Sequence, residues 1–199
     1  GGACWVAGGA AQARWAAREE GARLLRAGLA EQAQQKAEAG LATQPNDAQL
    51  RFLKGVAQSQ RGQSEAASAT FSALTQDFPE LPEPYNNLAV LEAAAGRLDA
   101  ARAALETALR LNPGYATAQQ NLGDVYARLA GRAWARALEL DPANPALQPR
   151  LQILQQWPVP ARSSGDGPSI SPFGVFVRLQ CYANVFPAGL RDFAQIHGA

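Results

Sequence analysis

The sequence contains very few residues that coordinate metals or form covalent links. Among its 199 residues there is one histidine, His197, and there are two cysteines, Cys4 and Cys181, near opposite ends of the chain. A zinc site of the usual kind needs a full set of His, Cys or carboxylate ligands, and a disulfide framework needs several cysteines at regular spacings. The sequence excludes both, and it predicts no metal and no cofactor.

Neither charge of one sign nor hydrophobicity is concentrated in any stretch. Eighteen basic residues face seventeen acidic ones, which gives a formal net charge of +1. A nucleic-acid-binding surface requires a basic stripe, so this balance argues against a nucleic-acid partner. No run of about 18 apolar residues occurs, and the sequence therefore predicts no membrane span.

Methionine is absent, and the chain opens with a segment of small and apolar residues, 1–13. This segment ends in Ala11-Gln12-Ala13, the A-x-A pattern that signal peptidase reads at the end of a secretory signal. Two interpretations stay open. Segment 1–13 is either the remnant of a leader, in a periplasmic or secreted protein, or the frayed terminus of a cytoplasmic one.

Alanine, in contrast, is abundant. Its 43 residues recur at helical spacings, whereas few Val and Ile are present to support strands. Because β-branched residues favour strands and alanine favours helices, the composition predicts an all-α fold.

Proline recurs at intervals of 34 residues and marks an internal repeat. Pro45, Pro79 and Pro113 each close an amphipathic segment. Counting back from them defines units 14–47, 48–81 and 82–115. Position 15 of every unit is glycine and position 20 is alanine: Gly28, Gly62 and Gly96, and Ala33, Ala67 and Ala101. A period of this length is typical of stacked helix pairs.

The recurring residues have mechanical roles in such a pair. Glycine at position 15 ends the first helix in a left-handed conformation, and proline at position 32 stops the second. Small residues at positions 8 and 20 allow the helices to approach closely, while Phe71 and Leu105 at position 24 fill the space between them. This pattern resembles the tetratricopeptide repeat family. The resemblance implies a right-handed α-solenoid of antiparallel helix pairs.

The fourth unit, 116–144, lacks five residues where the turn between its helices belongs. Trp134 and Ala137 then occupy positions 24 and 27. Apolar residues keep one helical phase through the junction, which predicts one long helix in place of a hairpin: Leu122, Val125, Tyr126, Leu129, Ala133, Ala137 and Leu140. The array therefore covers 14–157.

A capping helix, 145–157, is predicted to begin after Asn144 and to cover the open end of the array. From Pro158 the composition becomes rich in Pro, Gly and Ser, which predicts a linker and an irregular tail over 158–199.

The sequence contains no motif of an active site. There is no nucleophile elbow, no H-E-x-x-H pair, no phosphate-binding loop and no dinucleotide fingerprint. The sequence therefore predicts a protein that is not an enzyme and has no catalytic residues.

The resemblance to tetratricopeptide proteins implies a binding groove instead. In that family the first helix of each unit lines a concave face with positions 2, 5, 9, 12 and 13. Carried over, this implies a scaffold that binds a protein or peptide partner through twelve residues: Arg18, Leu25, Arg26, Phe52, Val56, Gln60, Glu83, Asn86, Val90, Gln120, Asp124 and Arg128. Asn86 and Arg128 are expected to be exposed and to contribute little to stability. Two alternatives stay open, a reader of single-stranded RNA and an accessory subunit of an enzyme.

Overall fold

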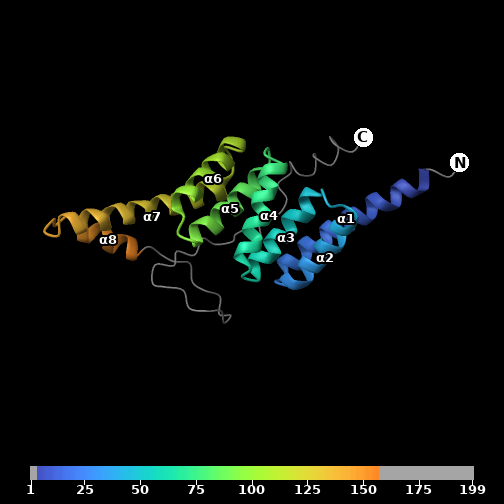
Figure 1. The fold of residues 1–199 in the computed structure, drawn as a ribbon, viewed down its shortest axis with the longest axis horizontal. Helices are drawn as coiled ribbons and strands as arrows, with labels where there is room; N and C mark the ends of the chain where they lie inside the picture. Colours follow the sequence, from blue (N-terminus) through green and yellow to red (C-terminus); the bar gives the residue numbers. More distant parts are fainter. Residues whose placement is uncertain (1–3, 157–199) are drawn as a thin grey trace. The chain divides into compact units, whose positions relative to one another are not determined.

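The described part of the chain, residues 4–156, is entirely helical. In the computed structural model these residues form eight α-helices and no strand (Figure 1). The helices are α1 (Cys4–Arg26), α2 (Ala30–Thr43), α3 (Ala48–Gln60), α4 (Ser64–Asp77), α5 (Pro82–Ala94), α6 (Leu98–Leu111), α7 (Ala116–Leu140) and α8 (Leu147–Gln155). The predicted all-α class of paired helices is confirmed.

The described residues form two compact units, with the division after Leu74 inside α4. In the first compact unit, which contains the first two repeats up to Leu74, α1 packs on α2 and α3, and α2 packs on α3. Helix α4 joins α3 through an edge-to-face contact between Phe52 and Phe71, whose ring centroids are 5.6 Å apart. A hydrogen bond of 2.8 Å from the Thr70 hydroxyl to Gln58 lies in the same interface.

In the second compact unit, α5 and α6 form a closely packed pair, on which α7 lies. Helix α8 packs on α7. The core of this unit consists of small and branched residues from α5, α6 and the first half of α7: Ala89, Ala93, Leu98, Ala101, Leu105, Ala108, Ala118, Leu122 and Val125. Figure 1 shows that the second half of α7 continues past the α5–α6 pair.

The three repeat glycines end their helices as predicted. Gly28, Gly62 and Gly96 have φ angles of +74°, +74° and +79°. After each glycine the next amide donates to a carbonyl five residues back, as from Arg97 to Glu92 at 2.9 Å, which completes a Schellman motif. Because an L side chain disfavours this backbone conformation, glycine is required at position 15.

Small residues hold the paired helices close together. A Cβ atom placed on Gly55, at position 8, would lie only 2.8 Å from Cε1 and Cζ of the Phe71 ring. Phe71 and Leu105, at position 24, are 0% and 1% exposed. The alanines at position 20 of all three units are likewise fully buried. The predicted close approach is confirmed.

The fourth unit contains one continuous helix, as predicted, because α7 runs unbroken from Ala116 to Leu140. The apolar stripe on it is buried only in part. Leu122 and Val125 lie in the core, whereas Tyr126 is 47% and Leu140 is 72% exposed. The stripe continues past the end of the helix pair that covers its first half.

The two ends of the described region differ in detail from the predicted boundaries. Helix α1 begins at Cys4, so residues 4–13 of the suggested leader are helical. The capping helix is shorter than 145–157: the side chain of Asn144 accepts from the amide of Ala146 in a turn, and α8 begins only at Leu147. The predicted linker and tail over 158–199 lie outside the described residues.

Substitution at position 8 tests this packing with a matched pair of variants. Gly55→Ala is expected to destabilise the protein by about 1–3 kcal/mol, because the new methyl group displaces a buried aromatic ring. Gly123 occupies the same position in the fourth unit, but a Cβ atom there meets no atom within 4 Å. In dilute solution, where the chain is unpaired, Gly123→Ala is therefore expected to stabilise by up to about 1 kcal/mol through helix propensity. Urea denaturation measures both, and equal effects would contradict the assigned repeat register.

Candidate functional site

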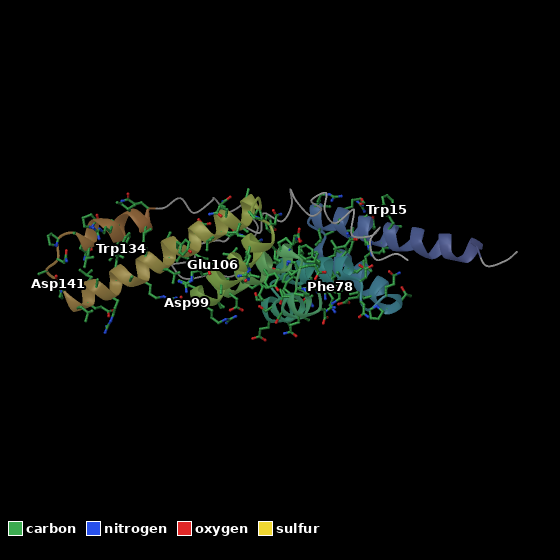
Figure 2. All side chains as sticks on the ribbon, turned by 90° about the horizontal axis from the view of Figure 1, so that it is seen from above. Trp15, Phe78, Asp99, Glu106, Trp134 and Asp141 are labelled. Atoms are coloured by element: carbon green, nitrogen blue, oxygen red, sulfur yellow. The ribbon has the colours of Figure 1, made fainter. Side chains whose placement is uncertain are left out.

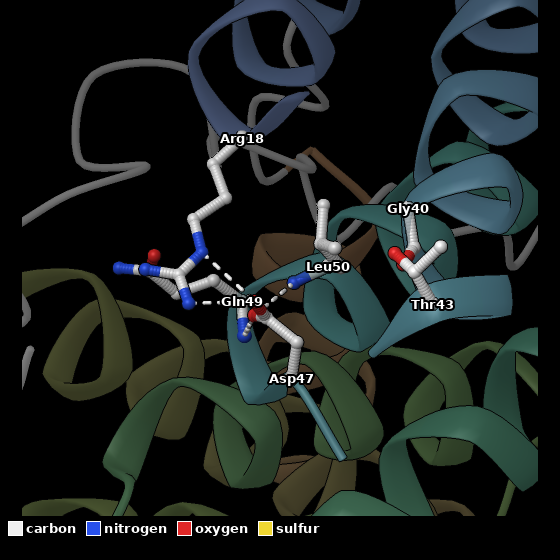
Figure 3. A network of polar contacts seen from close by, with 6 residues as sticks. All are labelled: Arg18, Gly40, Thr43, Asp47, Gln49 and Leu50. Atoms are coloured by element: carbon white, nitrogen blue, oxygen red, sulfur yellow. Dashed lines mark hydrogen bonds and ion pairs between the residues drawn. The ribbon is translucent and has the colours of Figure 1, made fainter. Parts of the chain in front are cut away.

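Arg18 is the first of the expected groove residues in the first compact unit, and its side chain forms an ion pair within the chain. Its Nε and Nη2 donate to Oδ2 of Asp47 at 3.0 and 2.6 Å (Figure 3). The other carboxylate oxygen of Asp47 accepts from the backbone amides of Gln49 and Leu50 and caps α3. Arg18 thus ties α1 to the start of α3, across 29 residues of sequence.

The other expected groove residues of the first compact unit differ widely in how far their side chains are exposed. Leu25 and Val56 belong to the core. Phe52 is half-buried against Phe71, and Gln60 is also half-buried. Only Arg26 is exposed, at the last residue of α1.

In the second compact unit, two buried side-chain amides form a hydrogen bond that joins α5 to α7. Nδ2 of Asn121 donates to Oδ1 of Asn86 at 2.8 Å, and both residues are buried. The neighbouring Asn87 donates to the carbonyl of Glu83 within α5. Val90 is also buried on α5. Asn86 therefore fixes the second unit internally, with its side-chain oxygen already bonded.

Two arginines of α7 bind the end of α5. Nη1 of Arg128 donates to the carbonyl of Ala93 at 2.6 Å, and Nη2 of Arg132 donates to the carbonyl of Gly96 at 3.1 Å. Cations at this end of a helix oppose its negative dipole and satisfy carbonyls that lack a helical partner. Burial, and next the charge of Arg132, lower the pKa of Arg128.

Two carboxylates lie on the same two helices, Glu83 in the first turn of α5 and Asp124 on α7. Burial raises the pKa of both carboxyl groups. No ion pair joins either of them to a cation within residues 4–156. Gln120, one helical turn before Asp124, is exposed. We call Gln120, Asp124 and Arg128 the α7 polar face, because residues four apart share one side of a helix.

Comparison with known proteins adds the family. The sequence model of the TPR repeat matches residues 91–129, from the end of α5 into α7. Residues 91–129 carry a tetratricopeptide repeat.

The repeats are similar to those of a tetratricopeptide repeat domain-containing protein of Arabidopsis thaliana chloroplasts, PYG7, with 38% identity over 84 residues. That match covers 40% of this chain and 28% of the plant protein, so the chain spans under a third of the length of this curated relative.

Solved structures show the same fold. The chain is similar to PilF of Pseudomonas aeruginosa, with 21% identity and a TM-score of 0.57 over 73% of this chain and 69% of that one. It is also similar to a thermophilic TPR protein of Thermus thermophilus, with 25% identity and a TM-score of 0.54 over 71% and 80% of the two chains. None of the helices in the described region is long and apolar enough to cross a bilayer.

The repeat fold explains why two expectations about exposure were wrong. Asn86 and Arg128 were expected to be exposed, yet both bond to a group on the helix one repeat away. Sequence reasoning also missed Asn121, at the position after the expected groove residue Gln120. Asp47 was detectable, because an aspartate directly before a helix is a typical N-cap.

Removing one side of the amide pair tests its structural role. Asn86→Ala is expected to destabilise the protein by about 1–3 kcal/mol, because the buried amide of Asn121 loses its acceptor. The control is Gln120→Ala, because Gln120 is exposed and precedes Asn121 on α7. It is expected to change the unfolding free energy by at most about 0.5 kcal/mol. Thermal and urea denaturation measure both. Equal stability of the two variants would show that the bond contributes nothing.

The buried carboxyl of Glu83 predicts a pH-dependent gain. A carboxyl whose pKa is raised in the folded state destabilises the fold once the pH exceeds the unfolded pKa, since the unfolded chain loses its proton first. Glu83→Gln is therefore expected to match the wild type near about pH 3 and to be the more stable protein at about pH 7. Glu65→Gln, an exposed carboxylate in the first turn of α4, is the matched control without this gain. A difference that is the same at both pH values would contradict the assignment.

Proposed function

We propose that the protein is a non-enzymatic scaffold that binds a protein or peptide partner, and that the α7 polar face is part of the contact. Tetratricopeptide repeats typically mediate protein–protein interaction, and proteins of this fold are generally not catalysts. The observation that carries the proposal is that the polar side chains of Gln120 and Asp124 are accessible on a fixed helix. They lie one turn apart on a helix that the Asn86–Asn121 bond holds in place, and their side chains are accessible.

The chemistry of these two residues indicates what the partner presents. The carboxylate of Asp124 is partly desolvated. Within residues 4–156 it has no ion pair, since the Arg128 guanidinium on the same face donates to the Ala93 carbonyl. A lysine or arginine of the partner would supply a cation, and a charge pair formed away from bulk water is stronger than an exposed pair. The Gln120 amide can donate to and accept from a peptide backbone. We expect an extended segment with a basic side chain.

Of the twelve residues implied by the family resemblance, the proposal uses those that are not buried in a core. Leu25, Val56 and Val90 are packed in the cores of the two units. In the first unit, Arg26, Phe52 and Gln60 stay candidates. Export to the periplasm also stays a proposal, which depends on the Ala11-Gln12-Ala13 pattern alone.

A peptide library displayed on phage and selected against the full chain tests this proposal even though the natural partner is unidentified. Selected peptides are expected to be enriched in Lys and Arg, and their binding, measured by fluorescence anisotropy, is expected to weaken as salt is raised. Asp124→Asn and Gln120→Ala are each expected to weaken binding by about tenfold, or about 1.4 kcal/mol, while the melting temperature stays constant.

Arg110→Ala is the control for this experiment, because Arg110 is exposed on α6 and lies outside the α7 polar face. It is expected to bind the selected peptides as the wild type does. Peptides that bind wild type, Asp124→Asn and Gln120→Ala equally well would place the contact elsewhere, and a library that yields no binders would contradict the proposal as a whole.

A further inference from the structure

The fourth repeat keeps the residues of a helix pair but has no turn with which to form one. In the second repeat, 48–81, the second helix folds back so that Phe71 at position 24 meets Gly55 at position 8 of the first helix. In the fourth unit both helices are fused into α7. Gly123 stands at position 8 and Trp134 at position 24, eleven residues apart on one helix. At 1.5 Å per residue they lie about 16 Å apart along its axis, too far for contact.

The contact surfaces that the second and third repeats bury are less completely covered in the fourth. Gly55 is filled by the Phe71 ring, whereas a Cβ atom on Gly123 would meet nothing within 4 Å. Leu105 lies in a core between its own first helix, α5, and the next one, α7. The corresponding Trp134 is labelled in Figure 2. It contacts the next helix, α8, where the Arg150 guanidinium lies 5.8 Å from its ring centroid. Trp134 is accordingly half-buried, with no helix in the place of α5.

The same holds along the rest of this face. Ala101 and Ala108, at positions 20 and 27 of the third unit, are fully buried. Their equivalents after the five-residue deletion, Ala130 and Ala137, are only half-buried. The residues of this face recur at steps of three and four, which places them on one side of α7, and none is charged: Gln119, Gly123, Ala127, Ala130, Trp134 and Ala137. We call this side the α7 seam.

We propose that two copies of the chain pair through the α7 seam, antiparallel and around a two-fold axis, so that Trp134 of each copy fills the notch at Gly123 of the other. The pairing reproduces, between two chains, the contact that the chain already makes between α3 and α4 at Gly55 and Phe71. It is an exchange of second helices, and short or missing hinge turns favour such exchange because they prevent closure within one chain.

The occupant is a second copy because both complementary surfaces belong to this chain. A two-fold axis brings the notch of one copy to the tryptophan of the other twice, so neither is left over. No residue of the seam is charged, and the Arg150 guanidinium beside Trp134 belongs to α8. The same antiparallel register brings Leu140, which is 72% exposed, beside the start of the α7 helix of the second copy.

The mass of the full chain in solution is the first test. Light scattering after size exclusion is expected to give twice the chain mass of 21.0 kDa. Gly123→Glu, which places a charged side chain in the notch, is expected to give 21.0 kDa with an unchanged helical spectrum. The control Ala103→Glu makes the same kind of change at an exposed site on α6 and is expected to stay dimeric. A wild-type chain that is monomeric at about 100 μM would overturn the proposal.

Cysteine cross-linking tests the register. In a background with Cys4→Ser and Cys181→Ser, the pair Gln119→Cys and Leu138→Cys is expected to form disulfides between two chains under mild oxidation. Within one helix these residues lie about 28 Å apart, whereas a disulfide requires Cα atoms within about 7 Å. In the control pair, Gln119→Cys with Glu139→Cys, the second site lies on the opposite side of α7. Equal cross-linking of both pairs, or of neither, would overturn the register.

Restoring the missing turn separates helix exchange from simple stickiness of the face. Insertion of the five residues that hold positions 15 to 19 of the third repeat, Gly-Arg-Leu-Asp-Ala of 96–100, between Leu129 and Ala130 allows the second half of α7 to fold back on its first half. This variant is expected to be a monomer with helical content equal to that of the wild type. A dimer that persists after the insertion would show that the copies do not pair by exchange.

Discussion

The close approach of paired helices at one small residue per repeat is the constraint on which the rest of this structure depends. At Gly55 the space is so narrow that even a methyl group would meet the Phe71 ring. A large side chain at position 24 can fill that space only if the second helix returns at a fixed level, and this level is set by the left-handed glycine of the turn. Packing and turn geometry therefore enforce the same 34-residue period.

In the fourth repeat the turn is missing, while the residues that pack in the other repeats are kept. Without five residues there is no turn, but alanine-rich sequence on both sides of the junction has high helix propensity, and the helix continues through Gly131. The first half of α7 still seats on α5 and α6, where Leu122 and Val125 enter the core. Its second half loses that cover and relies on α8. The repeat keeps its inherited register while its inner surface lacks the usual partner helix.

Polar residues hold α7 in this position. The Asn86–Asn121 bond and the Arg128 contact with the Ala93 carbonyl each join α5 to α7 across 35 residues of sequence. Arg18 and Asp47 have the same role in the first unit. Arg18, Asn86 and Arg128 are three of the twelve residues that the family resemblance implied for a groove, and the fold uses all three as internal links. Gln120 and Asp124 are accessible because no neighbouring helix requires them.

Features that depend on residues close together in the chain can be predicted from the sequence. The period, the glycine turns, the all-α class and the unbroken helix through the shortened repeat follow from local hydrogen bonding, propensity and spacing along one helix. The tertiary structure alone decided which polar residues serve as links. Asn86 and Gln120 share position 5 of their units, yet one is buried and the other exposed, because only Asn86 has a following repeat helix that presents Asn121 to it. Burial of a side chain depends on a neighbour more than thirty residues away, and no local pattern contains that neighbour.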